Sequence, residues 1–104
     1  MASSITATEL NDIMAEQGKV CVLDVRRKAD FDRAPETIAG AVWLDPEKIE
    51  EWRATLPGKQ ELVVYCVKGG PVSQSVANAL QENHPGVRFL EGGILGWQEQ
   101  ESRK

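Results

Sequence analysis

The sequence has 104 residues, of which 41% are hydrophobic and 27% are charged, as in soluble globular chains that bury one core. Its formal net charge is −4 and it has no basic stripe, so we expect no nucleic-acid partner. No apolar run approaches the roughly 18 residues of a membrane span, and "MASSITATEL" lacks the basic start and apolar centre of a secretory signal. We therefore expect a cytoplasmic protein with no membrane partner, provided that no leader has been removed.

The cysteine and histidine content limits redox and metal chemistry. Cys21 and Cys66 are too few for a disulfide scaffold and lack the paired spacing of zinc ligands, and His84 is the only histidine. We expect no metal site and no cofactor. Cys21 lies inside an apolar stretch, where inert burial is favoured over a role as a resolving thiol.

In chain order, the first predicted element is a helix. Thr6-Ala7-Thr8-Glu9 has the spacing of a capping box, and apolar residues follow at helical intervals from Leu10. Gly18 is a natural stop for this helix. The apolar, β-branched stretch "KVCVLDV" then predicts a strand that is buried on both faces.

A weaker strand and a second helix come next. "IAGAVWL" predicts the strand. Asp45-Pro46-Glu47 has the pattern of an N-cap, a proline at the first helical position and an acidic first turn, and predicts a helix that runs to about Thr55. Trp52 on this helix is expected to be half exposed. Pro57-Gly58 breaks the chain.

The second half of the chain repeats the alternation of strand and helix. "ELVVY" predicts a buried strand, and the helix after it is expected to begin at Ser73 or Gln74. His84-Pro85-Gly86 ends that helix, with His84 expected to cap it, and "VRFL" predicts the next strand.

The C-terminal segment predicts a tight turn at Gly92-Gly93, a short helix over "ILGWQEQ" and a frayed tail at "QESRK". Strands and helices thus alternate along the whole chain. This alternation predicts an α/β fold with a parallel sheet and helices on both of its faces.

Cys66 stands where the strand "ELVVY" runs into a loop that contains Lys68 and two glycines. Ligands bind at this edge of a parallel sheet, glycines let several N–H groups turn toward one point, and the next helix adds its N-terminal amides. With the nearby charge of Lys68, these features predict a stabilised, partly exposed thiolate in a cradle that also suits an oxyanion. The alternative is a buried, inert cysteine followed by a flexible turn.

Four stretches, in order, resemble the rhodanese (thiosulfate sulfurtransferase) family. "VVYCVKGGPVSQSVANAL" looks like the family's active-site loop, in which a strand-end cysteine opens a short loop around its sulfur. "VCVLDVRRKADF" is similar to the family's strand ending in Asp-Val-Arg, "IAGAVWLDP" to its Ile-x-Gly-Ala segment, and "FLEGGILGWQEQ" to its closing Gly-Gly-x-x-x-Trp. The resemblance covers nearly the whole chain. It implies a single rhodanese-like domain over residues 1–104, with three layers and a mostly parallel sheet.

The resemblance also implies a function. Family members take sulfane sulfur from thiosulfate onto the loop cysteine as a persulfide, and pass it to cyanide or another thiophilic acceptor. Cys66 would be the nucleophile and Lys68 a substrate-binding cation. The substrate-binding amides would be those of Lys68, Gly69, Gly70, Val72 and Ser73. The chemistry of the residues agrees, because thiosulfate, sulfite and a persulfide are anions that need donors rather than a general base.

Two positions depart from the family pattern. Pro71 stands five residues after the cysteine, where many members have Arg, Thr or Ser; it removes one amide and stiffens the loop. Thr37 precedes Ile38 where the family usually has a histidine. Neither change touches the nucleophile.

Other functions could use a similar site. Phosphatases and arsenate reductases of related fold need a larger loop that ends in arginine, but the sixth residue after Cys66 is Val72 and no arginine occurs before Arg88. Rhodanese-like binding modules often lack the cysteine that this chain has. A sulfur carrier that receives persulfide from a partner protein, with incidental thiosulfate turnover, needs the same thiolate and cradle. A protein sulfur acceptor therefore stays open.

Asp24 and Arg26 end the early strand, at the same sheet edge as Cys66 if the strands are parallel. Two interpretations of this segment are open. Arg26, Arg27 and Lys28 could lend positive potential to the site, or Asp24 and Arg26 could hold neighbouring loops by hydrogen bonds. The second interpretation is favoured.

Overall fold

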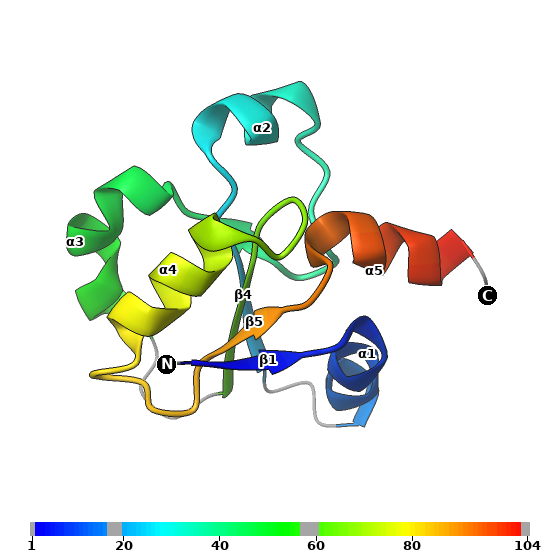
Figure 1. The fold of residues 1–104 in the computed structure, drawn as a ribbon, viewed down its shortest axis with the longest axis horizontal. Helices are drawn as coiled ribbons and strands as arrows, with labels where there is room; N and C mark the ends of the chain where they lie inside the picture. The colour runs from blue at the N-terminus through cyan, green and yellow to red at the C-terminus, as the bar shows by residue number, and fades with distance from the viewer. Residues whose placement is uncertain (1, 17–19, 57–60, 103–104) are drawn as a thin grey trace.

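The computed structural model describes residues 2–16, 20–56 and 61–102. In chain order these residues form β1 (Ser3–Ile5), α1 (Ala7–Glu16), β2 (Val20–Asp24), α2 (Lys28–Arg33), β3 (Val42–Trp43), η1 (Pro46–Lys48), α3 (Ile49–Trp52), η2 (Arg53–Thr55), β4 (Glu61–Tyr65), α4 (Pro71–Leu80), β5 (Arg88–Leu90) and α5 (Gly93–Ser102), as Figure 1 shows. The expected stop at Gly18 and the break at Pro57-Gly58 lie outside the described residues. None of the described helices combines the length and apolar character that a membrane crossing requires.

The sheet is parallel throughout its described strands, in the order β1-β5-β4-β2-β3. β4 lies in the middle and pairs with β2 from Val20↔Glu61 to Asp24↔Tyr65. After β2 the chain crosses to β3 on one side, whereas after β4 it crosses to β5 on the other side. The carboxyl ends of β2 and β4 therefore flank a topological switch point, which is where open α/β sheets bind ligands.

Helices cover both faces of the sheet, as the sequence predicts, and the three-layer fold is confirmed (Figure 1). The side chains of β4 alternate between the faces. Val63 and Tyr65 belong to a cluster with residues of α1 and α5. Leu62 and Val64 belong to a second cluster with residues of α3 and α4. Burial on both faces explains why the β4 sequence is apolar at successive positions rather than at alternate ones.

Both predicted helix caps are confirmed. The N–H of Thr6 donates to Oε1 of Glu9 at 3.0 Å and the N–H of Glu9 donates to Oγ1 of Thr6 at 3.1 Å, which is the reciprocal pattern of a capping box. The hydrogen bond from the Thr6 main chain lowers the pKa of Glu9. At the second helical segment, Oδ1 of Asp45 accepts from the N–H of Glu47 at 2.9 Å.

The segment after Asp45 differs from the expected continuous helix. It is one turn of α-helix between two 3-10 turns, and Trp52 is buried rather than half exposed. The indole Nε1–H of Trp52 donates to the main-chain oxygen of Asp45 at 2.8 Å, and the ring packs in the second cluster. The tryptophan therefore fastens this segment to the sheet.

The predicted boundaries of α4 and α5 need correction. α4 begins at Pro71 and not at Ser73 or Gln74, because proline suits the first helical position, where its missing N–H would have no partner. The main-chain N–H of His84 closes the other end by donating to the oxygen of Leu80 at 2.9 Å. α5 extends through Ser102, into the segment expected to fray.

Asp24 and Arg26 form a buried polar network that holds the loops beside them. Their side chains are 0% and 3% exposed, and Nη2 of Arg26 lies 2.6 Å from Oδ2 of Asp24. The same guanidinium donates to the main-chain oxygens of Ala34 (2.8 Å) and Glu36 (3.0 Å). This geometry confirms the favoured interpretation, and it means that the charge of Arg26 is already compensated.

Tyr65 completes this network from the end of β4. Its hydroxyl donates to Oδ2 of Asp24 at 3.1 Å and accepts from the N–H of Ile38 at 3.1 Å. Burial raises the pKa of Tyr65 far above its usual range, so the hydroxyl stays protonated and remains a donor. The network thus joins the ends of β2 and β4 to the loop that follows α2.

We expect Tyr65→Phe to lower the free energy of unfolding by about 1–3 kcal/mol, because a buried carboxylate and a buried N–H each lose a partner. Chemical denaturation measures this change. Ser102→Ala is the matched control, since it deletes a hydroxyl that bonds the Gln98 oxygen on an exposed surface, and it should change stability by less than about 0.5 kcal/mol. Equal losses in the two variants would contradict the role of the network.

Candidate active site

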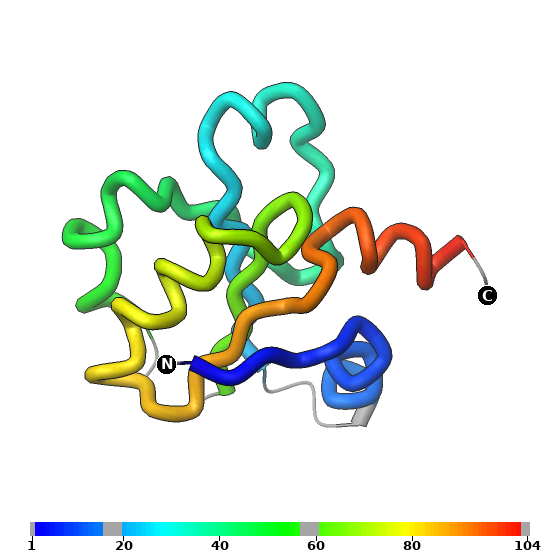
Figure 2. Tube along the Cα trace, viewed as in Figure 1, coloured from blue at the N-terminus to red at the C-terminus, as the bar shows by residue number. Residues whose placement is uncertain are grey.

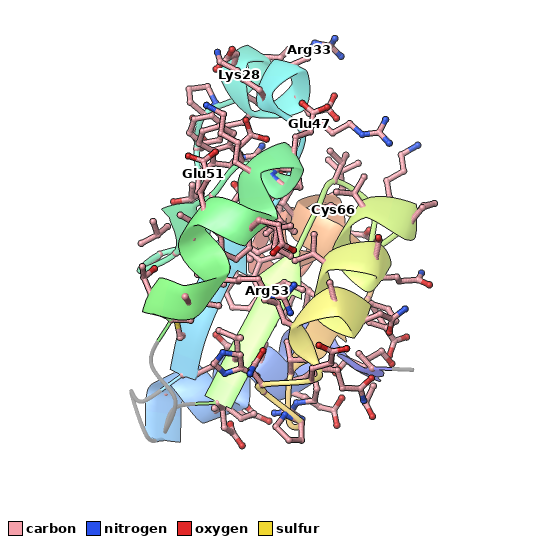
Figure 3. The ribbon with its side chains drawn as sticks, turned by 90° about the vertical axis from the view of Figure 1, so that its left-hand side faces the viewer. Lys28, Arg33, Glu47, Glu51, Arg53 and Cys66 are labelled. Carbon is pink, nitrogen blue, oxygen red and sulfur yellow. The ribbon has the colours of Figure 1, made fainter. Side chains whose placement is uncertain are left out.

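The chain after β4 makes a short loop before α4 (Figure 2), and Cys66 stands at the start of this loop, next to the first turn of α4 (Figure 3). Its thiol donates a hydrogen bond to Oγ of Ser73, with the sulfur and oxygen 3.2 Å apart. Cys66 is only 5% exposed, so the expectation of a partly exposed thiol is wrong. The sulfur is instead approached through a cavity of about 280 Å³ that Cys66 helps to line.

The cavity lies at the switch point between the ends of β2 and β4. Two segments line it. Arg26, Arg27 and Asp30 come from the chain after β2, and Cys66, Val67, Lys68, Gly70, Pro71 and Val72 come from the chain after β4. Three of the predicted substrate-binding residues therefore share one cavity with Cys66. Of the other two, Ser73 contacts the sulfur directly and Gly69 lies within the loop without lining the cavity.

The start of α5 contacts the Cys66 loop through main-chain hydrogen bonds. The N–H of Ile94 donates to the main-chain oxygen of Cys66 at 2.9 Å, and the N–H of Leu95 donates to that of Val67 at 3.2 Å. Gly93 allows this close approach. Its φ is +58°, and a Cβ there would lie 2.4 Å from both carbonyl oxygens. The predicted Gly92-Gly93 turn is confirmed, and its second glycine is required by contact with the loop.

The carbonyl oxygens of Gly69 and Gly70 are also bound. The oxygen of Gly69 accepts from Nε2 of Gln74 at 3.0 Å, and the oxygen of Gly70 accepts from the main-chain N–H of Gln74 at 3.3 Å. Among the described residues, by contrast, the main-chain N–H groups of the loop and of the first turn donate to no acceptor, and these include the N–H groups of Lys68, Gly69, Gly70, Val72 and Ser73. Main-chain N–H groups seldom stay unpaired, so this excess of donors suits an anionic ligand.

The charges at the cavity differ in part from those suggested by the sequence. Arg26 is paired with Asp24, and Lys28 lies outside the lining with its Nζ 2.7 Å from Oδ2 of Asp32. Of the three basic residues after β2, only Arg27 therefore brings an uncompensated charge to the cavity, and it is joined there by Lys68.

Sequence reasoning missed α2 and, with it, the position of Asp30. Asp30 is a half-buried carboxylate in the same cavity wall as Arg27. The signal for this helix was the spacing of Lys28 and Asp32, four residues apart and opposite in charge. The signal is weak because no residue of α2 is buried, so no apolar periodicity marks the helix.

The sequence profile described as "Rhodanese-like domain" matches residues 6–100. The chain belongs to this rhodanese-like domain family. A protein named "Sulfurtransferase" from Allochromatium vinosum is 26% identical over 99 residues, which are 93% of this chain and 89% of that protein. A "Probable adenylyltransferase/sulfurtransferase MoeZ" from Mycobacterium tuberculosis is 30% identical over 94% of this chain, which spans 25% of that longer protein.

A solved structure of similar length supports the same fold. A rhodanese-related protein from Thermoplasma volcanium superimposes with a TM-score of 0.79 at 24% identity, over 94% of this chain and 92% of that one. The rhodanese-like fold is thus shared over nearly the whole length of both chains.

We expect Gly93→Ala to lower the free energy of unfolding of this rhodanese-like chain by about 1–3 kcal/mol, because alanine at φ +58° is strained and its Cβ meets two carbonyl oxygens. The variant should also change the rate at which iodoacetamide alkylates Cys66, since the loop must shift. Denaturation and peptide mass spectrometry measure the two effects. Gly86→Ala is the control, because nothing lies within 4 Å of a Cβ added there. A Gly93→Ala protein that matches this control in both measurements would contradict the role of Gly93 in the contact between α5 and the loop.

Proposed function

We propose that this chain is a thiosulfate sulfurtransferase that works through a persulfide on Cys66. The observation that carries the proposal is that Cys66 lines a cavity and belongs to a loop in which most carbonyl oxygens accept hydrogen bonds while the N–H groups donate none. Membership of the rhodanese-like family and a relative named sulfurtransferase support the reaction class. The choice of thiosulfate as the sulfur donor rests on its charge, because a dianion suits a loop whose N–H groups are available for hydrogen bonds.

In the first half-reaction, the Cys66 thiolate attacks the outer sulfur of thiosulfate. A new S–S bond forms, the bond between the two thiosulfate sulfurs breaks, and sulfite leaves with the electron pair of that bond. The charge of −3 is the same before and after the step, and no proton, oxidant or reductant is needed. A general base is unnecessary once the cysteine is ionised, so the site needs hydrogen-bond donors instead.

In the second half-reaction, an acceptor attacks the outer sulfur of the persulfide. With cyanide as acceptor, a C–S bond forms, the S–S bond breaks, and thiocyanate leaves while the electron pair returns to Sγ of Cys66. The thiolate is thereby restored. The hydroxyl of Ser73 lies 3.2 Å from Sγ and can donate to the sulfur whenever it is ionised.

The anionic substrate and the persulfide would be held by two sets of donors. The first set is the loop amides of Lys68, Gly69 and Gly70. The second set is the first-turn amides of Val72 and Ser73, which point along a helix whose N-terminal end favours negative charge. Pro71 occupies the first helical position, so its missing N–H leaves this second set in place.

Two alternative functions were compared with thiosulfate sulfur transfer: a persulfide carrier and a phosphatase. A persulfide carrier for a partner protein uses the same sulfur and loop, and a low rate with thiosulfate alongside fast transfer to a protein would favour it. A phosphatase is disfavoured, because only the short segment from Val67 to Gly70 separates Cys66 from α4 and no arginine comes from this loop.

We expect Cys66→Ser to abolish sulfur transfer while the protein remains folded, because the nucleophile is lost and one buried side chain of similar size replaces another. Mass spectrometry of the intact protein after thiosulfate should show one added sulfur atom, removable by cyanide, in the parent chain and none in the variant. Cys21→Ser is the matched control and should keep the added sulfur. Sulfur uptake by Cys66→Ser, or its loss from Cys21→Ser, would refute the assignment.

We expect Lys68→Ala to raise the KM for thiosulfate by about five-fold with a smaller change in kcat, because an exposed cation is lost from the cavity wall. The difference from the parent should shrink as ionic strength rises. Steady-state kinetics with thiosulfate and cyanide measure both effects. Lys28→Ala removes the same charge outside the cavity and serves as the control. An unchanged KM in Lys68→Ala would remove Lys68 from the binding site.

A further inference from the structure

A second, larger cavity adjoins the one that contains Cys66. Its volume is about 530 Å³, within the range of roughly 300–1,000 Å³ of small-ligand sites. The two cavities share Arg27, Pro71 and Val72. The second one continues along α4 past Ser75 and Val76, and its opposite wall includes Glu47 from the segment after β3. A ligand in this cavity therefore lies next to the entrance to the Cys66 sulfur.

Two opposite charges stand on the walls of the second cavity. Glu47 and Arg27 are exposed, and neither side chain has an ion pair or hydrogen bond within the part of the chain that the structure describes. Figure 3 shows Glu47 on the side of the helical segment that faces Cys66. From α4, the same cavity is lined by the apolar residues Val72 and Val76 and by Ser75. The cavity thus offers one site for a cation, one site for an anion and an apolar wall.

We propose that this cavity binds the sulfur acceptor, and that the acceptor is a small thiol that carries both an ammonium and a carboxylate group, as amino-acid thiols do. This inference rests on the proposed sulfur transfer. Glu47 pairs with the ammonium group and Arg27 with the carboxylate. Because Cys66 is only 5% exposed, the reacting sulfur must come on a narrow arm such as a CH₂–SH group. A small thiol meets that need while its charged body stays in the adjoining cavity.

The transfer step balances without an added oxidant or reductant. The acceptor sulfur forms a bond to the outer sulfur of the Cys66 persulfide, and the S–S bond to Sγ breaks with its electron pair on Sγ. The thiol proton of the acceptor moves to the transferred sulfur. The products are a Cys66 thiolate and the hydropersulfide of the acceptor.

The test compares Glu47→Gln with Glu51→Gln. Glu51 lies on the same helical segment but outside the cavity, and Figure 3 shows it on the opposite side from Cys66, so its replacement makes the same charge change as a control. Four acceptors are compared: cysteine, N-acetylcysteine, cysteine ethyl ester and cyanide. N-acetylcysteine lacks the ammonium group, and cysteine ethyl ester lacks the carboxylate. Glu47→Gln should raise the KM for cysteine and its ester by about three- to five-fold, and leave the KM for N-acetylcysteine and cyanide unchanged. The parent chain should have its lowest KM among the thiols for cysteine.

Two results would overturn the acceptor assignment. One is an equal KM of the parent chain for all three thiols. The other is a Glu47→Gln variant that either changes the KM for every acceptor alike or behaves as Glu51→Gln does. Faster transfer to a reduced protein thiol than to cysteine would replace the small thiol by a protein partner and would also count against the proposal. The proposed function is checked separately, because loading of Cys66 by thiosulfate and its unloading by cyanide do not depend on Glu47.

Discussion

The hydrogen bonds from the start of α5 to the carbonyl oxygens of Cys66 and Val67 are the constraint on which the site depends. A peptide group has one donor and one acceptor, and the two point in nearly opposite directions. When the acceptors of a loop are bound on one side, its donors remain for a ligand on the other side. Gly93 makes this possible, since any larger residue would push α5 away from the loop. A turn distant in sequence thus sets the orientation of the peptide groups in the cysteine loop.

The buried network of Asp24, Arg26 and Tyr65 plays a complementary part. It joins the carboxyl ends of β2 and β4, and through Ala34 and Glu36 it fixes the chain that follows α2. The segment that brings Arg27 and Asp30 to the cavity is therefore held on both sides of α2, although α2 itself buries no side chain. As a consequence, the charge of Arg26, the arginine closest to the end of β2, is neutralised by Asp24. Positive charge at the cavity comes instead from side chains that solvent reaches, where salt weakens their attraction for an anion.

The sequence predicted those structural elements whose residues are buried in a regular pattern. Strands β2 and β4, their burial and the place of Cys66 followed from apolar runs and their ends, because burial on both faces leaves a strong pattern. β1 could not be predicted, since only one of its three residues, Ile5, is buried. The burial of Cys66 could not be predicted either. It results from contacts of α4 and α5 with the loop, which join segments far apart in the chain and leave no local signal.

In the proposed reaction, the sulfur donor and the sulfur acceptor are recognised by different parts of the fold. Main-chain N–H groups of the loop attract any small anion of suitable shape, because such groups are chemically alike and select a ligand only by their positions and partial charges. In the proposed reaction, discrimination among acceptors comes from side chains outside the loop, such as Arg27 after β2 and Glu47 after β3. These residues can change without moving the amides around the sulfur. A chain of this fold can thus keep one sulfur chemistry while its surface loops change the molecule that receives the sulfur.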